Sequence, residues 1–384
     1  KYYINEGGGY NDITPIRVTT AAGDVTFSAT NGSSVLTVTD TNHGASDNDF
    51  VTFSGAATLG GNVTAAVLNQ EYQIFNVVNA NTYEIKAREV ATVSEITVDG
   101  TYSPTLVVAS GSDSGNGGSS IVGKYQITVG LDTTVAGTGW GAGTWSRGTW
   151  GSGATLTAVG DTLRIWSHDN FGEDLIINVR NGGIYYWDKS TSSEPFLPAV
   201  ELSNLAGADA TTPTIAKQVM ISDRDRHVIM FGCDSETNIG VQDPLLIRFS
   251  DQENPLTWSA QATNTAGDLR IGTGSEIITA LETRQQILVF TDKSLHAMQY
   301  LGPPFTFGIN LISENITIAS PLSAVAVDDM VFWMGEEEFY MYGGGVQKLP
   351  CSVRSYVFED FNTQQQEKVT ASINSSYSEV WWFY

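Results

Sequence analysis

The chain has 384 residues, and its 42 acidic and 19 basic side chains give a formal net charge of -23 at pH 7. A surface this negative repels phosphate, which argues against a groove that binds nucleic acid through Lys and Arg. Charged residues make up only 16% of the chain, and its 39 glycines with many Thr, Val and aromatic residues favour short strands joined by tight turns over a helical bundle.

The cysteines and the apolar runs exclude two further classes. Cys233 and Cys351 are too few for a disulfide framework and fit synthesis in a reducing compartment. The longest apolar runs fall far short of the roughly 20 residues that cross a bilayer, so no membrane-spanning segment is expected. Both ends read as strand interiors, and we expect the natural polypeptide to continue on either side.

The first 108 residues predict two kinds of β-structure. Residues 1–17 combine a strand, a glycine turn and the phrase Asp12-Ile-Thr-Pro15, and we assign them to the first strands of a β-propeller blade. Residues 18–108 alternate Thr and Val with Gly and Asn turns, which indicates an inserted small β-sandwich or barrel. Strands are expected within it at residues 34–39, 50–53, 72–78 and 82–86.

Residues 109–124 form a Gly/Ser/Asp stretch that we interpret as a linker. The segment from Gly118 to Lys124 has the spacing of a phosphate-binding loop. However, Tyr125 stands where that motif needs a Ser or Thr hydroxyl, and the following alternation predicts a strand, not a helix. We therefore expect no nucleotide cofactor there.

A Gly/Trp tract at residues 137–153 carries Trp140, Trp145 and Trp150 at even spacing. Glycine supplies backbone freedom and indole supplies a large contact area. Two interpretations stay open. The three tryptophans are candidate contacts to a neighbouring subunit, or the tract folds back onto its own sheet.

We assign residues 125–384 to the β-propeller, because residues 161–384 repeat one pattern: a short apolar run, a tight polar turn and a second run rich in aromatics. Successive units lie about 45 to 60 residues apart, the range of a four-stranded propeller blade. We therefore predict an all-β chain, a β-propeller with a small inserted β-domain. The paired runs are 174–179 with 183–187, 226–231 with 244–249, 286–290 with 295–299 and 330–334 with 339–342, and 379–384 opens one more.

No catalytic or metal-binding constellation emerges from the motifs, and we predict neither enzymatic activity nor a cofactor. The four histidines are scattered singly, without metal-ligand spacing. Residues 336–338, three consecutive glutamates, are interpreted as a solvated turn, although they also suit a cation. The histidines are His43, His168, His227 and His296.

An enzymatic alternative is a sialidase-like propeller. Residues 250–258, from Ser250 to Trp258, are similar to the Asp-box turn of those enzymes. Their Asp-to-Trp spacing is too long, the expected glycine is missing, and arginine is too sparse for a cluster that binds a substrate carboxylate.

Several phrases together resemble the propeller-bearing tail nozzle proteins of short-tailed bacteriophages, a group that overlaps the packaged-DNA stabilisation proteins. The region from the 40s to the 80s additionally resembles a β-module of phage tail proteins, through residues 42–44, 51–55 and 68–72. The phrases that carry the nozzle resemblance are Asp12-Ile-Thr-Pro15, the Trp140 to Trp150 tract, and residues 163–175, 181–188, 249–258 and 379–384.

The resemblance implies a structural virion protein of the tail. It would be one subunit of a homo-oligomeric ring, usually a hexamer, below the portal and adaptor proteins, and tail fibres are possible further partners. The ring would retain packaged double-stranded DNA and form the channel for its ejection, without sequence-specific binding. Acidic lumen walls would keep the DNA mobile, although solubility alone also accounts for the charge. The alternative is a glycan-binding or glycan-cleaving propeller, for example a receptor-binding tail protein.

Overall fold

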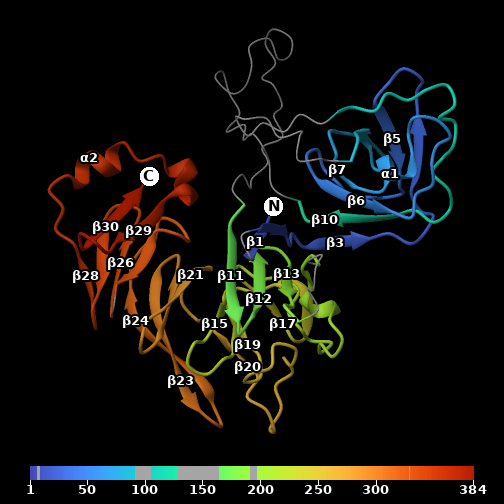
Figure 1. The fold of residues 1–384 in the computed structure, drawn as a ribbon. Helices are drawn as coiled ribbons and strands as arrows, with labels where there is room; N and C mark the ends of the chain where they lie inside the picture. Colours follow the sequence, from blue (N-terminus) through green and yellow to red (C-terminus); the bar gives the residue numbers. More distant parts are fainter. Residues whose placement is uncertain (7–8, 91–104, 129–163, 191–196, 328) are drawn as a thin grey trace, which may run out of the picture. The chain divides into compact units, whose positions relative to one another are not determined.

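The computed structural model describes residues 1–6, 9–90, 105–128, 164–190, 197–327 and 329–384 (Figure 1). The contacts within the chain divide it into two units, Lys1–Thr162 and Leu163–Tyr384. Apart from two short α-helices and two 3-10 helices, the described elements are strands, and all strand pairs are antiparallel. Neither α-helix in this part of the chain is long and apolar enough to span a membrane. The helices are α1 (Ala65–Leu68), α2 (Arg354–Glu359), η2 (Leu202–Asn204) and η3 (Thr363–Lys368).

The first unit contains a small β-sandwich of two four-stranded sheets. Alternate residues of its strands point inward, such as Leu36 and Val38, and both sheets contribute to one hydrophobic core. One sheet has the order β3 (Ile16–Thr19), β10 (Val122–Gln126), β6 (Phe50–Ser54), β7 (Glu71–Gln73). The other has the order β4 (Thr26–Ala29), β5 (Val35–Thr39), β9 (Thr82–Lys86), β8 (Asn76–Asn79).

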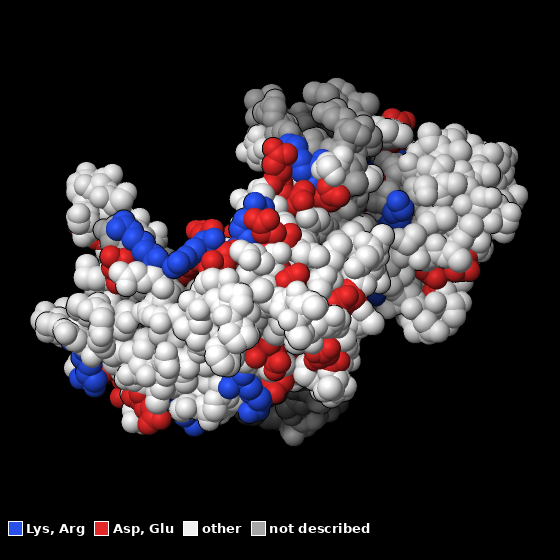
Figure 2. All heavy atoms as spheres, turned by 90° about the horizontal axis from the view of Figure 1, so that it is seen from below, with Lys and Arg blue, Asp and Glu red and all other residues white. Residues whose placement is uncertain are grey.

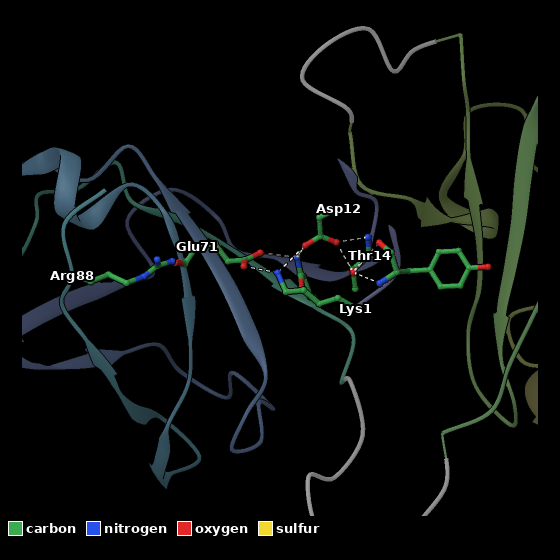
Figure 3. A network of polar contacts seen from close by, with 7 residues as sticks. Lys1, Asp12, Thr14, Glu71 and Arg88 are labelled. Atoms are coloured by element: carbon green, nitrogen blue, oxygen red, sulfur yellow. Dashed lines mark hydrogen bonds and ion pairs between the residues drawn. The ribbon is translucent and has the colours of Figure 1, made fainter. Parts of the chain in front are cut away.

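A hairpin of β1 (Tyr3–Glu6) and β2 (Gly9–Asp12) precedes the sandwich and is bonded to it. Figure 3 shows the Lys1 ammonium between the carboxylates of Asp12 and Glu71, with Lys1 Nζ 2.7 Å from Asp12 Oδ2. Gln126 Nε2 on β10 donates to Glu71 at 3.0 Å and to Asp12 at 3.3 Å. The hairpin is therefore tied to two strands of the sandwich.

The Asp12-Ile-Thr-Pro15 phrase closes on itself. Asp12 Oδ1 accepts hydrogen bonds from the backbone N of Thr14 at 2.9 Å and from its hydroxyl at 2.6 Å. Burial would raise the pKa of Asp12, but the hydrogen bonds from Lys1 and Thr14 outweigh it and the pKa is lowered. The phrase is thus a polar turn that needs a carboxylate at its first position.

The unit boundaries differ from the predicted ones. Residues 1–17 belong by their contacts to the unit that contains the sandwich, whereas they were assigned to a propeller blade. The predicted linker 109–124 is packed as well: Ala109 and Ile121 are buried, and β10 supplies a central strand between β3 and β6. A polar loop packs here because one buried carboxylate, that of Asp113, accepts hydrogen bonds from its backbone amides.

In the described part of the second unit, four four-stranded sheets follow one another and precede a two-stranded sheet. Each four-stranded sheet is an up-and-down meander, and the second carries an extra hairpin between its middle strands. The first sheet is β11 (Trp166–Phe171), β12 (Asp174–Val179), β13 (Ile184–Trp187) and β14 (Val200–Glu201). The second is β15 (Gln218–Ile221), β16 (Val228–Phe231), β19 (Leu246–Phe249) and β20 (Gly267–Arg270), with the hairpin β17 (Asp234–Ser235) and β18 (Asn238–Gln242). The third is β21 (Ile277–Glu282), β22 (Ile287–Thr291), β23 (Ser294–Gly302) and β24 (Thr306–Glu314). The fourth is β25 (Ala324–Val327), β26 (Met330–Met334), β27 (Phe339–Tyr342) and β28 (Val346–Lys348), and the two-stranded sheet is β29 (Thr370–Asn374) and β30 (Glu379–Phe383).

Neighbouring sheets of the second unit pack face to face. Each of the four hydrophobic clusters described in this unit joins two consecutive sheets, so the middle strands, such as β16, β19 and β22, are buried along their whole length. The first strands of neighbouring sheets also touch, as in the pairs β11 with β15 and β21 with β25. This is a β-propeller-like arrangement. The predicted fold class, all-β with propeller-type sheets and a small β-sandwich, is confirmed.

Candidate functional site

The first strands of the second unit are joined by side chains that bond the backbone of the next sheet. Ser167 and Asp169 point to the same side of β11 because they are two residues apart. Ser167 Oγ accepts a hydrogen bond from Val219 N at 3.0 Å, and Asp169 Oδ2 accepts one from Ile221 N at 2.8 Å. The first sheet therefore bonds to β15 without a continuous backbone ladder.

Gln218 forms the corresponding link from β15 to β21. Its Nε2 donates to the carbonyl oxygen of Ala280 at 2.8 Å, and its Oε1 accepts from Ala280 N at 2.8 Å and from Thr279 Oγ1 at 3.1 Å. The side-chain amide thus satisfies both backbone groups of one residue, as a neighbouring strand would. The two links fix three first strands to one another.

Acidic side chains gather beside these links. Asp223 follows β15, Glu282 ends β21, and Asp223 N donates to Glu282 Oε1 at 3.3 Å. Burial, together with the negative charges of Asp223, Asp169 and Asp225, raises the pKa of Glu282 to about 7. Glu282 therefore exchanges a proton near neutral pH, and the group as a whole repels anions.

The sequence patterns described above did not predict this acidic group, and none of them singles out Glu282. A signal was present: in each four-stranded sheet of the second unit, an acidic residue ends the first strand or lies in the turn that follows it. In chain order these residues are Glu173, Asp223, Glu282 and Asp329. Alignment of the repeats by their first strands would have revealed it.

The structure does not test the proposed subunit contacts, because Trp140, Trp145 and Trp150 lie outside the described residues.

The segment from Gly118 to Lys124 runs into β10, which pairs with β3 and β6, and it does not open a helix. The strand expected after the glycine loop is therefore present.

The four histidines lie in separate surroundings. His43 is buried in the sandwich, where its Nε2 lies 2.9 Å from Asn79 O, and His168 is exposed on β11. Burial lowers the pKa of His227 to about 4, and it also lowers the pKa of His296. His296 Nε2 lies 3.0 Å from Ser294 Oγ. Among the residues that the structure describes, no group of three or more His, Cys, Asp or Glu is placed to hold a metal ion.

The three consecutive glutamates form the turn between β26 and β27. Glu338 Oε1 lies 3.3 Å from both Lys348 Nζ and Arg354 Nη1, while Glu336 and Glu337 are exposed. A shallow hollow beside this turn is lined by Glu337, Arg354 and Phe358, among others. The turn is thus charge-paired through Glu338, and its other two carboxylates face solvent.

The segment from Ser250 to Trp258 is a structural loop between β19 and β20. Trp258 is buried, and its Nε1 donates to Pro255 O at 2.8 Å. Asp251 Oδ1 accepts from Thr265 N at 2.9 Å and from Thr265 Oγ1 at 2.7 Å. The tryptophan of this segment is core, and its aspartate closes the loop.

Charged side chains do not form a continuous patch on the face drawn in Figure 2. Basic side chains in blue and acidic side chains in red lie there in small groups, with broad uncharged areas between them. The residues described on that face therefore provide no basic track of the kind that binds a phosphate backbone.

Comparisons with known proteins give a distant likeness in structure. No family model and no curated protein matches the chain. Among solved structures, the AfRom2 CNH domain is 12% identical with a TM-score of 0.32, covering 54% of this chain and 60% of that one. The phage phi92 endosialidase is 10% identical with a TM-score of 0.23, covering 95% of this chain and 56% of that one. The chain spans less than two thirds of either.

Proposed function

We propose that this chain is a structural protein of a bacteriophage virion. It serves as a subunit of the tail nozzle ring below the portal and adaptor, where it retains packaged DNA and lines the channel for its ejection. The observation that carries the proposal is a stack of propeller-like sheets fixed to one another at their first strands, together with the phrases that resemble nozzle proteins. A stiff unit of this kind suits assembly into a closed ring.

Two of the resembling phrases have a structural role in keeping with this proposal. Asp12 closes a turn through Thr14, and the loop of residues 250–258 is closed by Asp251 and filled by Trp258. Such residues determine the shape of a subunit and are not placed to act on a substrate. The large negative charge supports the same role, because a channel through which DNA slides must not hold it.

The test is microscopy of the purified chain and of its parent particle. We expect negative-stain images of the concentrated chain to show closed rings, usually of six copies. We also expect antibodies against the chain to label the far end of the tail. Labelling of the capsid alone, or no labelling of intact particles, would contradict the proposal.

The acidic group around Glu282 supports a glycan-directed function as a second candidate. A carboxyl whose pKa lies near 7 beside other acidic side chains is the kind of group that a glycosidase uses as a general acid. The same samples decide between the two functions. A monomer that binds a glycan array and forms no rings would favour the glycan-directed function over the nozzle.

A further inference from the structure

Within the second unit, the outer edge of the third sheet differs from the outer edges of the other three four-stranded sheets. Proteins protect exposed sheet edges by keeping the last strand short and by placing charges on it. The outer strands β14, β20 and β28 have two, four and three residues, and each carries at least one charged side chain. The outer strand β24 has nine residues and no charge before Glu314 at its end. Its edge is the unprotected one among these four.

The lack of charge extends over the whole β23–β24 hairpin. Residues 294–313 contain no Asp, Glu, Lys or Arg, in a chain with 16% charged residues. Apolar side chains are nevertheless exposed on it: Leu301 by 59%, Phe305 by 74% and Leu311 by 48%. Figure 1 shows the end of this hairpin extending beyond the other strands of its sheet. The hairpin therefore offers solvent a neutral, apolar projection.

The hairpin is held by contacts close to its tip. Phe307 packs edge-on against Phe249 and His227, with ring centroids 5.0 and 5.2 Å away, and Tyr300 lies 5.5 Å from it. Thr306 Oγ1 donates to Thr265 O, in the loop between β19 and β20, at 3.0 Å. These contacts fix the hairpin immediately beside Phe305, so that little conformational freedom is lost when the exposed ring is buried by a partner.

We propose that the β23–β24 hairpin is a contact surface between copies of this chain. Phe305 at the tip inserts into the neighbouring copy, and the free edge of β24 lies along it. The inference rests on the proposed function and deepens it by naming the face through which the ring closes.

Charge decides which partner fits this surface. Two copies that each carry a net charge of -23 repel, and they associate best where neither presents charge. The rest of the surface repels anionic lipid and nucleic acid. A basic protein would bind better to an acidic patch than to this neutral hairpin. A neutral, apolar surface on a strongly acidic chain therefore suits a partner that is itself negatively charged. A second copy of the chain meets this condition.

The test is sedimentation velocity of the 384-residue chain at concentrations up to about 100 µM. We expect the wild type to self-associate, and Phe305→Asp and Leu311→Lys to weaken the dissociation constant by about 30-fold or more. The matched controls are Tyr356→Asp, whose side chain is also 74% exposed, and Val241→Lys, which is 57% exposed. Both controls should stay within about twofold of the wild type. Far-UV circular dichroism verifies that each variant is folded.

A photo-crosslinking residue at position 305 identifies the occupant. Crosslinks between two copies of the chain support the inference, and their position maps the receiving surface. Rings that form equally well in both hairpin variants overturn the inference and leave the proposed ring intact. A wild type that stays monomeric overturns both. A monomer that pellets with phosphatidylcholine vesicles through Phe305 assigns the tip to lipid, and also overturns the inference.

Discussion

At the scale of single residues, buried carboxylates organise the loops of the sandwich. Asp113 accepts hydrogen bonds from the backbone N of Gly61, Asn62 and Val63 at 2.8 to 3.0 Å, and from the N and Oγ of Ser110 at 2.8 and 3.0 Å. Gly61 is required at its position, because a Cβ there would lie 2.7 Å from Asp113 Oδ2. One side chain thus holds two loops that are far apart in sequence.

We expect Asp113→Asn to destabilise the first unit by about 3 kcal/mol, because the amide nitrogen cannot accept the bonds of the oxygen it replaces. Burial would raise the pKa of Asp113, but the hydrogen bonds outweigh it and the pKa is lowered. The stabilisation is therefore complete above the pKa of an unfolded aspartate, about 4, and is lost as pH falls through the lower folded value.

Urea denaturation followed by circular dichroism, with hydrogen exchange at residues 61–63, measures the effect of Asp113→Asn. Asp24→Asn is the control, since Asp24 is exposed and accepts one backbone bond at 3.1 Å. It should cost less than about 1 kcal/mol. Equal losses of unfolding free energy in the two variants would show that the five hydrogen bonds of Asp113 do not stabilise the first unit.

At the scale of elements, the middle strands of each sheet follow from the sequence more directly than the outer ones. The predicted runs 174–179 and 330–334 coincide with β12 and β26, since most residues of these strands are apolar and largely buried. The two-residue β14 has too little pattern to be found. The predicted run 72–78 is divided by the structure into β7 and β8, which belong to different sheets.

The side-chain links between sheets are a second property of the elements, and Gln218→Ala tests them. Removal of the Gln218 amide leaves the N and O of Ala280 without this partner, and we expect a loss of about 2 kcal/mol with faster hydrogen exchange at Ala280. Gln299→Ala is the control, because Gln299 is exposed and bonds only another side chain, that of Gln286, at 3.0 Å in the described structure. Identical melting curves for the two variants would contradict the role assigned to Gln218.

At the scale of the whole molecule, the net charge of -23 dominates its behaviour toward other polyanions. We expect no binding of double-stranded DNA by the purified chain even at about 50 mM salt, where phosphate contacts are strongest. Fluorescence anisotropy of a labelled duplex measures this, with a basic DNA-binding protein as positive control. An affinity that falls as salt rises would reveal phosphate contacts and contradict a non-adhesive channel wall.

The sequence by itself determined the all-β class, the repeated hairpins and the charge, because these depend on composition and on periodicity within short segments. It also gave the strand that follows the glycine loop at Gly118, where alternation is local. The packed loop around Asp113, the link from Gln218 to Ala280 and the acidic group at Glu282 were decided by tertiary structure. Each joins residues more than 45 positions apart or depends on burial, and neither distance in space nor solvent exclusion is encoded in a local pattern.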